Sequence, residues 1–284
     1  MTIKTLTLSP TEIEILAHQM KAYPMRTIDY AHFQAKLDKG TITAYLSGKV
    51  VFAGADALLY AQQFETKSAS QAGSDEVGTG DYFGPITVCA CYVDETQMDY
   101  INTLNVFDSK QTSDSKVREL APILMDTLTY SLLVLDNVTY NKVHPTKNMN
   151  AIKAELHQKA FSHLKNKLNG VLPELSIVDQ FTPKANYYRY LQDDYGITNL
   201  KFETKAESKY ISVACASIIG RYAFLRALDQ YSEYYKMDFP KGASAKVDQF
   251  GVQFVTKYTF NELNKVAKVH FVNTKRIEEL LQGI

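Results

Sequence analysis

The sequence predicts an α/β protein in two parts, a sheet domain in which strands alternate with helices and a smaller α+β unit before it. The length of 284 residues allows about two domains of roughly 100–200 residues each. Short apolar runs alternate with helix-like segments over most of the chain, which favours an α/β sheet. A polar segment rich in small residues, ETKSASQAG at 65–73, is typical of a linker. We therefore place the domains at residues 1–66 and 74–284, with the linker at 67–73.

The first unit has the signals of a strand, a helix, a hairpin and a second helix, at residues 2–8, 10–20, 41–52 and 55–64. Ser9 supplies the N-cap of the first helix, Pro10 its first position and Glu12 its third, which together form a capping box. In the hairpin, two β-rich runs flank the turn Ser47–Lys49. These signals predict a small α+β domain.

The second unit contains both strand and helix signals. Its apolar, β-rich runs lie at 86–93, 129–138, 175–178 and 200–203. Helical segments are predicted at 113–128, 150–168, 208–235, 247–258 and 262–269. Strands followed by helices in this way predict a sheet flanked by helices.

The composition excludes several classes of protein. Hydrophobic residues make up 45% of the chain, which is enough for a packed core and excludes disorder. The three cysteines, Cys89, Cys91 and Cys215, form neither a disulfide framework nor a zinc-ligand pair, and the first two are predicted on one face of a strand. No leader-like segment is evident, and no apolar run approaches about 18 residues. We therefore expect a soluble, cytoplasmic protein with no membrane partner.

The net charge is zero, with 31 basic and 31 acidic residues, so the chain lacks the basic excess usual in nucleic-acid binding. Two stretches differ from this average. Residues 142–167 contain six lysines and one acid, and residues 241–276 contain seven basic residues and two acids, so each carries a net charge of +5. A solvated helix face explains such a stretch, but two of them also allow a phosphate-binding surface.

Adjacent carboxylates precede two glycines in the segment SDEVGTGD at 74–81. Gly78 and Gly80 allow a positive φ and the close approach of another backbone. Asp75 and Glu76 repel each other, which favours either solvent or a shared hard cation such as Mg²⁺. A polar turn between two strands is the alternative interpretation. The segment has neither the lysine of a Walker loop nor the spacing of a dinucleotide-binding loop.

Two further acids lie where strands end. Asp179 follows the apolar run 175–178, and α/β folds place their sites at strand ends. Glu207 precedes the long predicted helix, where a carboxylate is also favourable against the helix dipole. Each has a structural explanation when taken alone. Together with Asp75 and Glu76 they would form a cluster able to bind two metal ions, one activating water and one stabilising the leaving oxygen in phosphodiester cleavage.

A series of motifs resembles ribonuclease HIII, the bacterial branch of the type 2 ribonucleases H. The motifs are SDEVGTGDYFGP at 74–85, DSK at 108–110, NMNAIK at 148–153 with His157, DQF at 179–181, TKAESKYISVACASIIGR at 204–221, PKGAS at 240–244 and KVHFVNTK at 268–275. They cover the chain from about residue 74 to its C-terminus in the order of the family. The N-terminal unit resembles, by pattern rather than by signature, the TATA-box-binding-protein-like domain that this family carries.

The resemblance implies a ribonuclease-H-like fold, a mixed sheet flanked by helices, with a carboxylate tetrad that binds Mg²⁺ or Mn²⁺. Its members would be Asp75, Glu76, Asp179 and Glu207. Glu207 favours the HIII branch, because ribonucleases HII usually have Asp at the fourth position. Thr79 favours it too, because HII enzymes typically carry Arg or Lys between the two glycines.

The resemblance also implies substrate contacts. Gly78, Thr79 and Gly80 would lie against the RNA strand and sense 2′-hydroxyls, the groups that separate RNA from DNA. Ser109 and Lys110 would contact phosphates near the cut. His270 could touch the site, but a structural role is favoured for it.

We therefore expect an endonuclease that hydrolyses the RNA strand of RNA–DNA hybrids by a two-metal mechanism, leaving 5′-phosphate and 3′-hydroxyl ends. The first domain would hold the hybrid and raise affinity through a second site, and the protein would act as a monomer. Incision at single ribonucleotides in DNA, as in ribonuclease HII, is one alternative, and Thr79 argues against it. A hybrid-binding protein without catalysis is the other, and the four intact acids argue against that.

Overall fold

The computed structural model describes the chain except for residues 1, 9, 65–68, 108–112, 194 and 284. The chain forms two compact units, Met1–Lys67 and Ser68–Ile284, which are described separately. The first strand of the second unit begins at Gln71, so residues 71–73 of the predicted linker belong to a strand.

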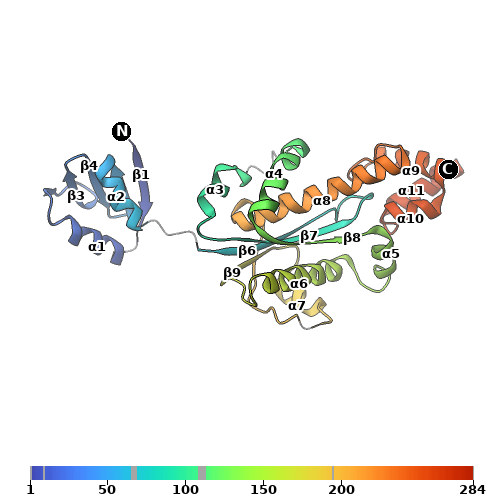
Figure 1. Ribbon diagram of the computed structural model, residues 1–284, viewed down its shortest axis with the longest axis horizontal. Coiled ribbons are helices and arrows are strands. Elements are labelled where there is room, and N and C mark those ends of the chain that lie inside the picture. Colours follow the sequence, from blue (N-terminus) through green and yellow to red (C-terminus); the bar gives the residue numbers. More distant parts are fainter. Residues whose placement is uncertain (1, 9, 65–68, 108–112, 194, 284) are drawn as a thin grey trace. The chain divides into compact units, whose positions relative to one another are not determined.

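The first unit is a five-stranded antiparallel sheet with two helices (Figure 1). Across the sheet the strands are β1 (Ile3–Thr7), β5 (Lys49–Ala53), β4 (Gly40–Tyr45), β3 (Ala31–Leu37) and β2 (Met25–Arg26). The helices are α1 (Pro10–Met20) and α2 (Ala55–Phe64). Leu16 and Met20 of α1 and Ala57 of α2 form one core with Ile42 and Phe52 of the sheet. The predicted strand, hairpin and helices are present, and β3 lies where no separate strand was assigned.

The second unit contains a five-stranded mixed sheet in the order β10-β9-β6-β7-β8. The strands are β6 (Gln71–Val77), β7 (Ile86–Val93), β8 (Thr129–Leu135), β9 (Leu175–Asp179) and β10 (Lys201–Glu203). The central strand β6 is antiparallel to β7 and parallel to β9. The outer pairs have the same directions on each side: β8 is antiparallel to β7, and β10 is parallel to β9. The predicted mixed α/β architecture is therefore confirmed.

Helices cover both faces of this sheet (Figure 1). On one face lie α3 (Met98–Thr103), α4 (Asp114–Thr127) and α8 (Ile211–Tyr235), and on the other α6 (Met149–Lys167) and α7 (Lys184–Tyr190). The strand residues alternate between the two cores, as the pleat requires. Cys89 and Cys91 pack toward α8 with Cys215, whereas Val88 and Ala90 of the same strand pack toward α6. The prediction that Cys89 and Cys91 share a face is confirmed.

Four further helices complete the unit: α5 (Asn137–Val143), α9 (Ala245–Tyr258), α10 (Phe260–Val266) and α11 (Val272–Gln282). The expected strand 129–138 ends earlier than predicted, because Asp136 caps α5 and its side chain accepts a hydrogen bond from the amide of Thr139 at 2.9 Å. The predicted helix from 208 is divided into a 3₁₀ turn, η2 (Ala206–Ser208), and α8.

Helix α8 meets the length and hydropathy criteria of a membrane span, but 67% of its most apolar window is buried inside the fold. Its apolar residues pack on β6 and β7 and against α4. A helix that is apolar on most sides is also what a central core position requires. The composition of α8 is therefore explained by its place in the core.

The two units have separate cores, which predicts that the second folds without the first. A chain lacking Met1–Lys67 should unfold in one cooperative thermal transition, measured by circular dichroism. From the resemblance to hybrid-cleaving enzymes, we also expect the shortened chain to have a raised KM on a long hybrid. A deletion chain that lacks a cooperative transition, or one with unchanged KM, would contradict the respective part of the prediction.

Candidate active site

Two of the predicted acids are brought together by strand register. β6 and β9 are parallel neighbours, and Ser74 pairs with Val178. The residues that follow, Asp75 and Asp179, therefore lie side by side at the carboxyl ends of the two strands. Both carboxyl groups have raised pKa values partly because each lies near other acids of the predicted tetrad. The edge of the sheet at which they meet is where open α/β folds place their sites.

Glu207 joins this edge from the turn that follows β10. Lys205 adopts a left-handed conformation, with φ of 55°, and turns the chain into the short helix η2. The amide of Ala206 then donates a hydrogen bond to Asp179 Oδ1 at 2.9 Å, and Glu207 contributes to the raised pKa of Asp179. Glu207 Oε2 is buried and has no hydrogen-bond partner among the described residues. An unpartnered buried carboxylate oxygen is a free position for a cation.

The charge on Asp75 is poorly compensated. Its side chain is buried, and burial is the largest cause of a pKa well above the usual value, followed by the charges of Glu76 and Asp179. Hydrogen bonds from the Ser217 side chain and from the Glu76 amide, the latter at 2.7 Å, oppose this shift only in part. Burial is also the main cause of the raised pKa of Asp179. A divalent cation bound at this edge would remove the penalty for ionising both groups.

Glu76 points to the opposite face of the sheet and is fully compensated. Lys153 Nζ binds Glu76 Oε1 at 2.9 Å, and His157 Nε2 binds Glu76 Oε2 at 2.8 Å. Burial raises the pKa of Glu76, but the hydrogen bond from His157 and the charges of His157 and Lys153 outweigh it, so the net shift is downward. Both carboxylate oxygens of Glu76 are thus already occupied by side chains of α6.

The partners of Glu76 are themselves held in place. The hydroxyl of Ser74 contacts His157 Nδ1 at 2.7 Å, so both imidazole nitrogens are bound and the ring orientation is fixed. The ring of Phe181 stacks on His157, with centroids 5.4 Å apart, and Lys153 Nζ lies 3.9 Å from the Phe181 centroid. Lys153 and His157 stand four residues apart on α6 and present one face to the site. Removing either partner of the buried Lys153–Glu76 pair should cost about 3–5 kcal/mol.

The four acids are chemically suited to bind hard divalent ions, but their carboxylates do not converge on one point. Carboxylate oxygens are the ligands that Mg²⁺ and Mn²⁺ prefer, and Glu207 Oε2 lacks any other partner. Within the described part of the chain, no three acidic, histidine or cysteine side chains lie close enough together to hold an ion. The carboxylate of Glu76 is directed to α6. Asp75, Asp179 and Glu207 share the edge, and Glu76 would have to exchange a side-chain partner to become a ligand.

The two glycines after the acids have different environments. Gly78 has φ of 91°, and a Cβ placed there would collide with the carbonyl oxygen of Pro85 and lie 3.0 Å from the ring of Phe224. Gly80 has no positive φ, and a Cβ there would meet no atom within 4 Å. The positive φ that both glycines allow is therefore adopted by Gly78 and not by Gly80. Gly78 is required by the fold, whereas Gly80 borders open space.

Other predicted residues lie elsewhere or outside the description. Ser109 and Lys110 fall within residues 108–112, which the structure does not describe. The ring of His270 stacks on His144 with centroids 3.7 Å apart, and Tyr140 contacts its Nδ1 at 3.2 Å. No contact joins His270 to the four acids among the described residues, which supports the structural role favoured for it.

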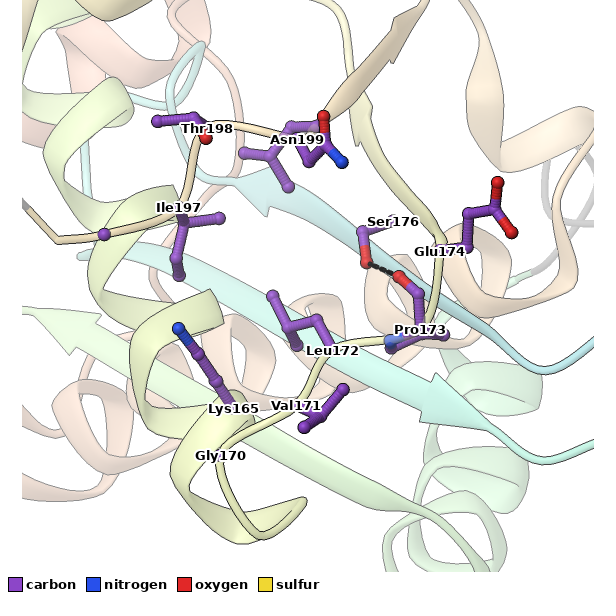
Figure 2. A pocket seen from close by; sticks show the side chains of 12 residues that line it. Lys165, Gly170, Val171, Leu172, Pro173, Glu174, Ser176, Ile197, Thr198 and Asn199 are labelled. Carbon is purple, nitrogen blue, oxygen red and sulfur yellow. Dashed lines mark hydrogen bonds between the residues drawn. The ribbon is translucent and has the colours of Figure 1, made fainter.

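A separate pocket of about 310 Å³ lies at the opposite end of β9 from Asp179 (Figure 2). Figure 2 shows the apolar side chains of Leu172 and Ile197 at this pocket and the Ser176 hydroxyl bonded to the carbonyl of Pro173, at 2.8 Å. None of the predicted site residues lines it. The pocket therefore plays no part in the carboxylate site.

Three residues of the site carried no individual role in the sequence interpretation. Lys153 and His157 belong to a motif that matches the family and to a lysine-rich stretch. A solvated helix face would explain such a stretch, but both side chains are buried. Their spacing of four on a predicted helix was the available signal. Ser217 lies in the middle of a long apolar helix, and only the packing of α8 on β6 places it near Asp75.

The chain matches the family model described as "Ribonuclease HII" over residues 72–274, and residues 5–76 match a domain of unknown function, DUF3378. Among curated proteins, ribonuclease HIII of Bacillus velezensis is 40% identical over 278 residues, covering 89% of each chain. Ribonuclease HIII of Bacillus subtilis is 40% identical over 276 residues, covering 88% of each. These alignments leave out about a tenth of this chain, which is less than the length of the first unit, so they include at least part of that unit.

Solved structures show the same likeness. The crystal structure of Bst-RNase HIII in complex with Mn²⁺ superposes with a TM-score of 0.74 at 34% identity and covers 100% of both chains. The RNase H3 structure from Aquifex aeolicus covers 94% of this chain at a TM-score of 0.58 and 22% identity. The latter identity is low, so that match supports the fold alone.

The two glycines should respond differently to substitution. Gly78→Ala places a side chain at a positive φ and against Pro85, so it should destabilise the second unit by about 2–4 kcal/mol. Gly80→Ala should leave stability within about 0.5 kcal/mol, because its Cβ enters open space. Thermal midpoints of the two variants check this. Equal midpoints for both, or a larger loss at Gly80, would contradict the geometry of the turn.

Proposed function

The chain belongs to the ribonuclease HII family, with ribonucleases HIII as its curated relatives, and on this premise we propose that Asp75, Asp179, Glu207 and Glu76 form its catalytic site. The protein is a ribonuclease H, an endonuclease that hydrolyses the RNA strand of RNA–DNA hybrids. The observation that carries the site assignment is the meeting of the buried Asp75 and the half-buried Asp179 at the adjoining ends of β6 and β9.

The cofactor of the enzyme is Mg²⁺ or Mn²⁺, and the proposed ligands are the four carboxylates. When bound, two such ions activate water and neutralise charge on the phosphate and the leaving 3′-oxygen, leaving 5′-phosphate and 3′-hydroxyl ends. Asp75, Asp179 and Glu207 provide oxygens with unmet charge or hydrogen-bonding capacity. Glu76 completes the set by exchanging a contact with Lys153 or His157 for one with the metal.

The task of the protein groups is to orient these carboxylates before substrate arrives. The Ala206 amide fixes Asp179 Oδ1, and the Glu76 amide fixes Asp75 Oδ1. Lys153 and His157 keep Glu76 ionised inside the protein. A preformed arrangement of charge lowers the reorganisation needed in the transition state.

Residues 78–80 are proposed to lie against the RNA strand. The open space beside Gly80 leaves room for a sugar-phosphate backbone, and backbone groups at a glycine can reach a 2′-hydroxyl. Thr79, which stands where ribonucleases HII typically carry a basic residue, supports cleavage of continuous hybrids over incision at single ribonucleotides. Parallel rate measurements on a uniform hybrid and on a duplex with one ribonucleotide would distinguish these activities.

The first unit is proposed to bind the hybrid. On β3, His32 and Lys36 are exposed and Gln34 lies between them. Gln34 accepts a hydrogen bond from Arg26 Nε at 2.7 Å and donates one to the Thr43 hydroxyl at 2.8 Å. This face of the sheet is polar and basic, as a phosphate-binding surface requires. We also propose a cytoplasmic location and action as a monomer.

Replacing Asp75 by Asn tests the site assignment. The amide is a poor ligand for Mg²⁺, so cleavage of a uniform hybrid should be almost abolished. Because ionised Asp75 is unfavourable in the metal-free fold, the variant should be at least as thermally stable as the wild type without metal. Added Mn²⁺ should raise the thermal midpoint of the wild type more than that of the variant. Hybrid binding should survive, since phosphate contacts supply most of the affinity.

Cleavage at the wild-type rate by Asp75→Asn under saturating Mg²⁺ would contradict the assignment. Chelation with EDTA is the control, because it should stop cleavage by the wild type while hybrid binding persists.

Substitutions in the turn test how the RNA strand is recognised. Thr79→Ala should retain most activity if the turn acts through its backbone. Gly80→Ala should lose at least about tenfold in kcat/KM, equal to about 1.4 kcal/mol of transition-state stabilisation, because its methyl group occupies the space of the RNA. The thermal midpoint and the Mn²⁺ titration of Gly80→Ala should match the wild type. Normal cleavage by Gly80→Ala would exclude close contact between this turn and the RNA.

A further inference from the structure

The turn at residues 78–85 is held by a distant part of the chain. The Gly84 amide donates to the carbonyl of Val266 and the Lys268 amide to the carbonyl of Tyr82, both at 2.9 Å. Phe83 and Ala267 form an isolated antiparallel bridge between these hydrogen bonds. The path of the turn therefore follows the strand-like segment 266–268.

The side chain of Lys268 adds a second set of contacts to the same turn. Lys268 Nζ donates to the carbonyl oxygen of Asp81 at 2.8 Å and to that of Gly84 at 2.5 Å. One ammonium group thus joins two carbonyls three residues apart, which fixes the curvature of the turn directly after Gly80. The Gly84 carbonyl has a second donor, Asn137 Nδ2 at 3.0 Å. Among the described residues, Lys268 is the one hydrogen-bond donor to the Asp81 carbonyl.

Lys268 is completely buried, with 0% of its side chain exposed. Burial lowers the pKa of its ammonium group to about 7. A charged amine at this position is therefore unfavourable because it is removed from water. Its acidic neighbour is Asp81, whose Oδ1 is itself bound by the Gly242 amide at 2.5 Å. An apolar side chain would avoid the penalty but would leave the Asp81 carbonyl without this donor. A long side chain with a terminal donor therefore suits this position.

We propose that Lys268 is a positioning residue for substrate recognition, which sets where residues 78–80 lie relative to the carboxylates and thus to the RNA strand. The inference rests on the proposed role of this turn in reading 2′-hydroxyls. Lys268 does not reach the RNA, because it is buried beneath the turn. It acts through Asp81 and Gly84, so its loss should change which sugars are accepted at the cut in addition to the rate.

The test compares Lys268→Met with the wild type in the full-length enzyme. Methionine has a similar length and no donor. Two substrates are used, a uniform RNA–DNA hybrid and the same hybrid with one 2′-deoxynucleotide beside the main cleavage site. The wild type should cut the first substrate much faster at that site. Lys268→Met should lose at least about tenfold in kcat on the uniform hybrid and should discriminate less between the two.

Asn141→Leu is the matched control. Asn141 Nδ2 donates to the carbonyls of Asn264 and Ala267 at 3.0 and 2.9 Å, so it anchors the same C-terminal segment without touching the turn. This variant loosens the same segment but keeps the Lys268 side chain, so it should discriminate between the two hybrids better than Lys268→Met does. Equal loss of discrimination in the two variants would assign the effect to the segment and overturn the role of the Lys268 side chain. Both variants are assayed below their thermal midpoints, and an unchanged Mn²⁺ titration for Lys268→Met would show that the carboxylates are in place.

Each outcome decides one question. If the wild type does not discriminate between the two hybrids, the proposed role of the turn is wrong. If the wild type discriminates and Lys268→Met does so equally, the role of Lys268 is overturned while that of the turn stands. Should Lys268→Met fail to fold, Lys268→Gln, which retains an amide donor, is judged by the same discrimination. Rescue of discrimination by Lys268→Arg would support the need for a long donor.

Discussion

The register between β6 and β9 is the constraint on which the site depends. Because the two strands are parallel and Ser74 pairs with Val178, Asp75 and Asp179 must meet at one edge of the sheet. A slip of one residue would reverse the faces of β6, placing Asp75 toward α6 and Glu76 toward α8. Contacts of β6 itself oppose that slip: Ala72 packs in the core on the side of α6, and at Gly73 a Cβ would lie 2.5 Å from the Val213 amide nitrogen of α8. The close packing of small residues thus fixes the position of the charged ones.

Charge is distributed unequally between the two adjacent acids. Glu76 has both oxygens bound by Lys153 and His157, and its pKa is lowered. Asp75 has a raised pKa because burial and neighbouring acids outweigh its hydrogen bonds. The unmet negative charge lies on the side of Asp75, and a cation bound there would stabilise the folded protein as well as serve catalysis.

Recognition is linked to the C-terminal part of the chain. The turn after the acids needs a glycine at Gly78 and is open at Gly80, and its curvature is maintained by Lys268 and by Gly242, whose amide binds Asp81. In our proposal, substrate recognition depends on residues more than 150 positions away in sequence, whereas the carboxylates depend on the sheet. The two proposed functions of the site should therefore be open to separate weakening.

The sequence by itself determined the two-part organisation and most of the helices, and it pointed to the four acids that we propose as ligands, because capping signals, apolar periodicity and family motifs are local properties. It did not predict β6 as a strand. Three of the five buried positions of this strand are Gln71, Ser74 and Asp75, and polar residues in the centre of a sheet resemble a turn when read alone. Only the tertiary structure decided that Lys153 faces Glu76, that Gly78 rather than Gly80 is conformationally required, and that Lys268 holds the turn. Those relations join residues far apart in the chain, and they arise from packing and from the burial of charge, which no local pattern records.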